Sequence, residues 1–163
     1  MDYLWTPWRA TYMREKREKT GCIFCQAAAS TADEENLVVY RGALSFVILN
    51  RYPYTSGHLM IAPFRHVSRL QQMDEAAADE VMRLARFAEG ALEETYRPEG
   101  LNLGINLGEA AGAGIEQHLH MHLLPRWWGD ANFMTTVGNA RIIPEALDDT
   151  YAKMKRAFSE LNV

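Results

Sequence analysis

Apolar residues recur with two different spacings along the chain. Short runs rich in β-branched and aromatic residues occupy residues 36–50 (NLVVYRGALSFVILN) and 58–64 (HLMIAPF). Arg41 and Gly42 divide the first run, which predicts a β-hairpin, and Pro63 ends the strand predicted in the second. A third run, LNLGINLG over residues 101–108, predicts another strand. The short connections favour antiparallel neighbours in one sheet.

Between residues 74 and 96 the apolar spacing changes to three and four positions, which predicts the longest helix. Asp74 stands where an N-cap residue is expected, and Pro98 with Gly100 closes the segment. The apolar stripe of this helix consists of Val81, Leu84, Ala85, Ala88 and Leu92.

A second helical repeat lies near the end of the chain and opens with Pro144. Its apolar positions are Leu147, Tyr151, Met154 and Phe158. Strands, one central helix, further strands and a terminal helix follow one another, an order that predicts an α+β fold with a largely antiparallel sheet.

Three of the five histidines alternate in EQHLHMHLLPRW, residues 116–127. In an extended chain His118, His120 and His122 share one face, because successive side chains point to opposite sides. A half-buried strand with a polar outer face would show the same alternation. Three neighbouring imidazoles favour chemistry instead, since histidine binds metals and acts as acid, base or nucleophile.

A glycine-rich loop precedes the histidines. Gly108, Gly112 and Gly114 permit positive φ and close approach, which lets backbone N–H groups converge on an anion. A plain hairpin connection is the alternative. Beside three histidines we favour phosphate binding, although the loop is neither a P-loop nor a Rossmann fingerprint.

The two cysteines form one motif, Cys22 and Cys25 in GCIFCQ. In a reducing compartment a structural disulfide is not expected, and the flanking sequence lacks a thioredoxin-like context. A metal site is favoured, but it needs two further ligands.

Composition sets the remaining bounds. With 163 residues, 48% hydrophobic and 23% charged, the chain suits one globular domain. The net charge of −4 predicts no nucleic-acid partner. Residues 1–20, MDYLWTPWRATYMREKREKT, carry no signal-peptide or membrane pattern, so we expect a cytoplasmic protein without membrane association in which these residues form an arm.

Two stretches together, residues 106–127 (NLGEAAGAGIEQHLHMHLLPRW) and 46–67 (FVILNRYPYTSGHLMIAPFRHV), resemble the histidine triad (HIT) superfamily. The sequence is most similar to its bacterial branch of diadenosine tetraphosphate phosphorylases and hydrolases, from WTPWR near the start to RWWGDANFM after the histidines. The resemblance implies one HIT domain over 1–163, with a C-terminal helical extension over 143–163. It also implies a five-stranded sheet with a central and a C-terminal helix, and a homodimer.

The resemblance also implies roles. His120 would attack the α-phosphorus of a dinucleoside polyphosphate and form a nucleotidyl-histidine, which water or inorganic phosphate then cleaves. His122 would support the reaction at the phosphate. The implied nucleotide contacts are Asn50, His58, Asn106, Gly112, Ala113, Gly114 and His122. Ala113 departs from better-known branches, which place a glutamine there.

Zinc-containing members of the superfamily imply the missing metal ligands. His66 and His118 would join Cys22 and Cys25 in a closed Cys₂His₂ zinc site, which is structural because no position is left for water.

Two other functions stay open at this stage. In one, His118 and His122 join a carboxylate to hold a catalytic metal; in the other, the protein binds nucleotides and regulates, with little turnover. The base, the phosphate-chain length and the acceptor are not fixed by the sequence. The residues after the histidines shape either the cleft mouth or the dimer contact: Trp127, Trp128, Asp130, Asn132 and Phe133.

Overall fold

The computed structural model describes residues 21–138 and 143–160. The arm predicted over residues 1–20 lies outside the described residues, as do residues 139–142 and 161–163 of the predicted C-terminal part. The chain order is α2 (Ile23–Ala29), α3 (Asp33–Asn36), β1 (Val38–Arg41), β2 (Ser45–Leu49), β3 (Leu59–Pro63), α4 (Glu75–Tyr96), β4 (Gly100–Ile105), β5 (Met121–Arg126), α5 (Phe133–Thr136) and α6 (Leu147–Glu160).

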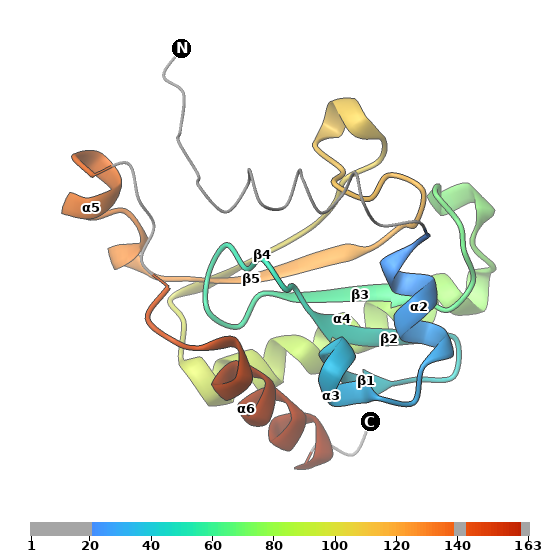
Figure 1. The fold of residues 1–163 in the computed structure, drawn as a ribbon, viewed down its shortest axis with the longest axis horizontal. Coiled ribbons are helices and arrows are strands. Elements are labelled where there is room, and N and C mark those ends of the chain that lie inside the picture. The colour runs from blue at the N-terminus through green and yellow to red at the C-terminus, as the bar shows by residue number, and fades with distance from the viewer. Residues whose placement is uncertain (1–20, 139–142, 161–163) are drawn as a thin grey trace.

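The five strands form one sheet in the order β1-β2-β3-β5-β4, and every neighbouring pair is antiparallel. This confirms the predicted α+β fold with a five-stranded antiparallel sheet, a central helix and a C-terminal helix. In Figure 1, α4 runs behind the strands and α2 lies in front of one end of the sheet. None of the described helices has the length and apolar character needed to cross a membrane.

The predicted hairpin is confirmed as β1 and β2, and its turn is attached to the central helix. Glu80 of α4 is only 4% exposed, and its carboxylate accepts the backbone N–H groups of Ala43 and Leu44 at 3.0 and 2.6 Å. Arg83 lies 2.8 Å from the same carboxylate. A buried charge is tolerated here because it is paired and hydrogen-bonded.

The central helix buries the predicted stripe: Val81, Leu84, Ala85, Ala88 and Leu92 are all in the core. Asp74 is the N-cap, as predicted, but its carboxylate pairs with Arg65 at 3.0 Å and caps no N–H. The helix ends when Arg97 adopts the left-handed conformation directly before Pro98. The C-terminal helix begins at Leu147, three residues after Pro144, because Pro144 belongs to the preceding loop.

The predicted histidine strand needs a correction. β5 begins only at Met121, so His118 and His120 precede the sheet ladder. The three rings still gather on one side, since Phe24 contacts the rings of His118 and His120, and His120 contacts His122. The histidine face is not a solvated outer face either: His118 is 0% and His120 5% exposed, because Phe24 of α2 packs against both rings.

Candidate functional site

The site lies on the face of the sheet that α2 partly covers. His122 on β5 pairs with Met60 on β3, and His58 comes directly before β3. Phe24 contacts the rings of His118 and His120, with centroids 5.2 and 4.7 Å apart. The structure therefore brings the three predicted histidines and His58 together: His58, His122 and His120 form one row of rings, and Phe24 links this histidine row to His118.

His120 is held in one orientation by the backbone of His118, two positions earlier. Its Nδ1 lies 2.8 Å from the carbonyl oxygen of His118, and a carbonyl can only accept, so Nδ1 carries the proton. The lone pair is then on Nε2. This arrangement suits a nucleophile, and the carbonyl stabilises positive charge that develops on the ring when Nε2 forms a bond.

A relay of hydrogen bonds fixes the other two rings. The backbone N–H of Tyr54 donates to His58 Nδ1 at 3.2 Å, so His58 carries its proton on Nε2. That proton is donated to His122 Nδ1, 2.9 Å away. His122 is left with a proton on Nε2, which makes this nitrogen a hydrogen-bond donor.

Asn50 supports this relay. Its Oδ1 accepts the backbone N–H of Tyr52 at 3.0 Å, and its Nδ2 lies 3.3 Å from His58 Nδ1. The Asn50 side chain, which the family resemblance places against the nucleotide, is thus engaged within its own loop, where it helps to orient His58.

Burial keeps the imidazoles neutral. Burial, with a smaller contribution from His122 and His120, lowers the pKa of His58 to about 3. Burial and then His120 lower the pKa of His122 to about 4. Burial also lowers the pKa of His120, against the opposing effect of the His118 carbonyl. All three rings are neutral at pH 7, as a nucleophile and a neutral donor require.

The glycine loop is more ordered than a plain connection. Gly108 and Gly112 adopt φ values of +90° and +89°, which confirms the expected positive φ, while Glu109–Ala111 form a short 3-10 turn. The N–H groups of Gly112 and Ala113 already donate to the carbonyls of Glu109 and Gly108. Of the three predicted backbone donors, only the N–H of Gly114 has no acceptor among the described residues. Asn106 faces this loop, with Nδ2 4.0 Å from the position of a Cβ at Gly112.

The four predicted metal ligands converge. One ligand atom from each of Cys22, Cys25, His66 and His118 lies within 4.8 Å of all the others. Cys22 Sγ is 3.3 Å and Cys25 Sγ 3.6 Å from His118 Nδ1, and Cys25 Sγ is 3.1 Å from His66 Nδ1. Tetrahedral zinc places its ligands roughly 3.3 to 3.8 Å apart, so the donor set fits.

The surroundings of this cluster also suit a metal. His118 Nε2 donates to the carbonyl of Pro63 at 2.8 Å, which directs Nδ1 toward the thiols. Burial acts to raise the pKa of Cys22, but hydrogen bonds with His118 and Cys25 outweigh it and lower the pKa to about 6. Sequence reasoning missed that Cys22 is the N-cap of a helix, α2, and that Cys25 stands on its first turn.

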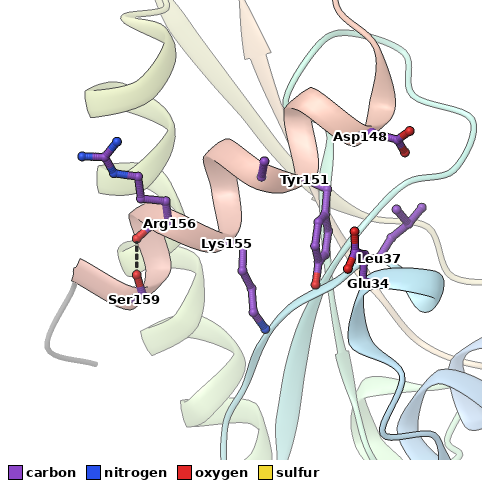
Figure 2. Close-up of a pocket in the computed structure, with 8 residues that line it drawn as sticks. Glu34, Leu37, Asp148, Tyr151, Lys155, Arg156 and Ser159 are labelled. Carbon is purple, nitrogen blue, oxygen red and sulfur yellow. Dashed lines mark hydrogen bonds between the residues drawn. The ribbon is translucent and has the colours of Figure 1, made fainter.

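Two hollows of about 440 Å³ each lie away from the histidine row. Figure 2 shows the first, between α3 and α6, where Glu34, Asp148, Lys155 and Arg156 mix both charges. No predicted site residue lines it. The second is lined by His66, Arg69 and Gly108 among others, with the Arg69 guanidinium beside Gly108.

The residues after the histidines divide into two groups. Trp127 packs edge-on against Tyr96, with centroids 6.4 Å apart, and Asp130 pairs with Arg126. Asn132 Oδ1 accepts the N–H of Met134 at the start of α5. Asp130 and Asn132 thus make local contacts and Trp127 packs against the end of α4, whereas Trp128 is 89% exposed.

Fold and site together define an α+β protein whose buried, neutral imidazoles are arranged for nucleophilic chemistry. The chain belongs to the histidine triad family, since the HIT domain matches residues 31–127. It is 42% identical to the AP-4-A phosphorylase of Mycobacterium tuberculosis, over 92% of this chain and 80% of that protein. It is 27% identical to a bis(5'-adenosyl)-triphosphatase of Dictyostelium discoideum, over 76% of this chain and 82% of that protein. These relatives support the predicted class, a HIT-type nucleotidyl hydrolase or transferase.

A solved structure shows the same fold. A zinc-bound histidine triad family protein from Mycobacterium smegmatis aligns with a TM-score of 0.69 and 24% identity, over 87% of this chain and 96% of the other.

Proposed function

We propose that the protein cleaves dinucleoside polyphosphates of the diadenosine tetraphosphate type at the α-phosphorus, through a nucleotidyl-His120 intermediate. The observation that carries this is the 2.8 Å hydrogen bond from His120 Nδ1 to the His118 carbonyl, which leaves Nε2 as a neutral nucleophile. The 42% identity to a protein named AP-4-A phosphorylase favours this substrate class.

The reaction proceeds in two displacements. His120 Nε2 forms a bond to the α-phosphorus, and the bond from phosphorus to the bridging oxygen breaks, with its electron pair leaving on the nucleoside polyphosphate. His122 Nε2–H donates a hydrogen bond to oxygen near the reacting phosphorus, where charge develops. Water or inorganic phosphate then attacks phosphorus, breaks the P–N bond and returns the electron pair to His120. The product is a nucleoside monophosphate or diphosphate, respectively.

The remaining site residues have supporting roles in this proposal. His58 and Asn50 hold His122 in the donor tautomer. Gly114 offers its backbone N–H to phosphate, and Asn106, Gly112 and Ala113 shape the loop beside it. Asn50 reaches a ribose only if a ligand replaces one of its present partners.

We assign zinc to Cys22, Cys25, His66 and His118, a closed set that fits a structural ion. The ion would link α2 to the segment that carries His120, and no chemical step needs it. The assignment disfavours the metal-dependent alternative, since His118 already belongs to this set. A homodimer and a cytoplasmic location complete the proposal.

The test is an incubation with diadenosine tetraphosphate, with and without inorganic phosphate, in the presence of a chelator. ADP plus ATP only with phosphate would identify a phosphorylase, and AMP plus ATP without phosphate a hydrolase. Both activities should vanish in His120→Ala. Undiminished turnover in that variant would overturn the role of His120, and binding without any turnover in the wild type would favour the regulatory alternative.

A further inference from the structure

Tyr54 is an exposed aromatic residue at the histidine row that the mechanism does not use. The residue is 49% exposed, yet its ring centroid lies 4.8 Å from that of His58 and 6.3 Å from that of His122. The angle to the His122 ring is 27°, so the two rings stack. One side of the phenol ring is therefore fixed by imidazole, while much of its surface is open to solvent.

The loop that carries Tyr54 is anchored at several points. The N–H of Asn50 donates to the carbonyl of His58, and the N–H of His58 donates to the carbonyl of Thr55, at 3.0 and 3.3 Å. The N–H of Tyr54 itself donates to His58 Nδ1. A ring that is already positioned loses little conformational freedom when a ligand stacks on it.

Tyr54 lies beside His122, not beside the nucleophile His120, which suits a contact with the departing part of the substrate. In an in-line displacement at phosphorus, the leaving group departs on the side opposite the attacking His120 Nε2. His122 offers the donor that supports charge at the phosphate, and Tyr54 stacks on His122. The aromatic residue at the other end of the row, Phe24, is 0% exposed and has no free face.

We propose that Tyr54 forms the subsite for the second purine, the one that departs on the leaving nucleoside polyphosphate. A nucleobase offers a flat π-face, and an exposed aromatic ring stacks on it with little dependence on hydrogen-bond pattern. The subsite makes the protein prefer substrates with a nucleoside at both ends of the phosphate chain. This proposal of a purine subsite rests on the proposed function.

The experiment compares two ligands that differ only in the second adenosine, diadenosine tetraphosphate and adenosine 5'-tetraphosphate. Dissociation constants are measured by calorimetry in a His120→Asn background, which prevents turnover, for Tyr54, Tyr54→Val and Tyr54→Phe. Each substitution keeps the backbone N–H that orients His58. The same Tyr54 variants are assayed for kcat and KM in the otherwise wild-type enzyme.

Tyr54→Val should raise the Kd and the KM for diadenosine tetraphosphate about 10-fold or more, as expected for one lost base stack. The Kd for adenosine tetraphosphate should stay within about 2-fold of the unsubstituted value. Tyr54→Phe should match the wild type with both ligands. If Tyr54→Val weakens the binding of both ligands equally, or of neither, the proposed subsite is wrong. Failure of the proposed function is seen separately, as absence of His120-dependent turnover by the wild type, because the binding comparison needs no turnover.

Discussion

At the scale of single residues, His58 decides which nitrogen of His122 carries a proton. His58 is 1% exposed. Its Nδ1 accepts a hydrogen bond from the backbone N–H of Tyr54, and its Nε2–H donates one to His122 Nδ1. If this bond is lost, the His122 ring is free to adopt the other tautomer, with a lone pair instead of a donor facing the phosphate. His58 is thus a positioning residue.

We expect His58→Leu to lower kcat/KM for diadenosine tetraphosphate by about 100-fold, mostly in kcat, because misplacement near the reacting centre costs on that order. His58→Gln, whose amide can still donate to His122, should lose clearly less. Steady-state kinetics measures the difference, with thermal unfolding of both variants as the control for folding. Equal kinetics of the two variants would exclude the relay.

At the scale of elements, Arg41 on β1 holds the C-terminal end of α2. Its guanidinium donates to the carbonyls of Ala27 and Ser30 at 2.8 and 2.7 Å, and it also bonds Ala28 and Asp33. The terminal carbonyls of a helix have no partner within the helix, so this one side chain satisfies most of them. Cys25 lies on α2 and Cys22 is its N-cap, which makes Arg41 a support of the metal cluster.

Arg41→Ala should lower the free energy of unfolding by about 3 kcal/mol, since charged hydrogen bonds are lost and carbonyls are left unpaired. Arg41→Lys should recover only part of the lost free energy of unfolding, because an ammonium group cannot reproduce the forked hydrogen bonds of a guanidinium group. Urea unfolding gives the values. Arg51→Ala is the matched control: Arg51 is exposed and bonds one carbonyl, that of Glu35, so a change within about 0.5 kcal/mol is expected. A similar loss in both variants would contradict the helix-capping role.

The elements also show what the sequence could and could not predict. The sheet and both long helices followed from apolar spacing, because burial of Leu84 and its neighbours imposes a period on the sequence. α2 was missed since its seven residues are too few for a period, and since Arg41, twelve positions beyond its end, stabilises it. The histidine site and the cysteine–histidine cluster were predicted from the residue types and from the family resemblance. The part of Tyr54 in orienting His58 could not be predicted, because the group that it contributes there is a backbone N–H.

At the scale of the whole molecule, the buried neutral histidines make stability depend on pH. The pKa values of His58 and His122, about 3 and 4, lie below the roughly 6.5 of an unfolded histidine. Below pH 6.5 the unfolded chain therefore binds protons that the folded chain does not. Stability is fully present above pH 6.5 and declines as the pH falls toward 4.

Between pH 6.5 and pH 5 each of these histidines should cost about 2 kcal/mol of stability. Urea unfolding of wild type and His58→Gln at pH 7 and pH 5 measures this. The variant has one fewer such group, so its loss between the two pH values should be smaller by about 2 kcal/mol. An equal loss in both proteins would show that His58 is not the group that titrates.

The metal cluster joins parts of the chain that are far apart in sequence. Cys22 lies 96 positions before His118, yet their ligand atoms are 3.3 Å apart. His118 also supplies the carbonyl that orients His120, so an ion on its ring would fix the nucleophile without taking part in the reaction. We expect one zinc per chain by elemental analysis. Cobalt substitution should give the absorption of a tetrahedral thiolate site.

Cys25→Ser and His66→Ala should lose the metal, lower the melting temperature by several degrees and reduce kcat while the products stay the same. A large change in KM is not expected, since neither side chain belongs to the histidine row. His122→Ala is the contrasting variant, because it should keep the zinc and lose activity. If His122→Ala loses the metal, or if Cys25→Ser retains a full equivalent, the ligand set is wrong. Metal-dependent catalysis would then have to be reconsidered with His122 as a ligand.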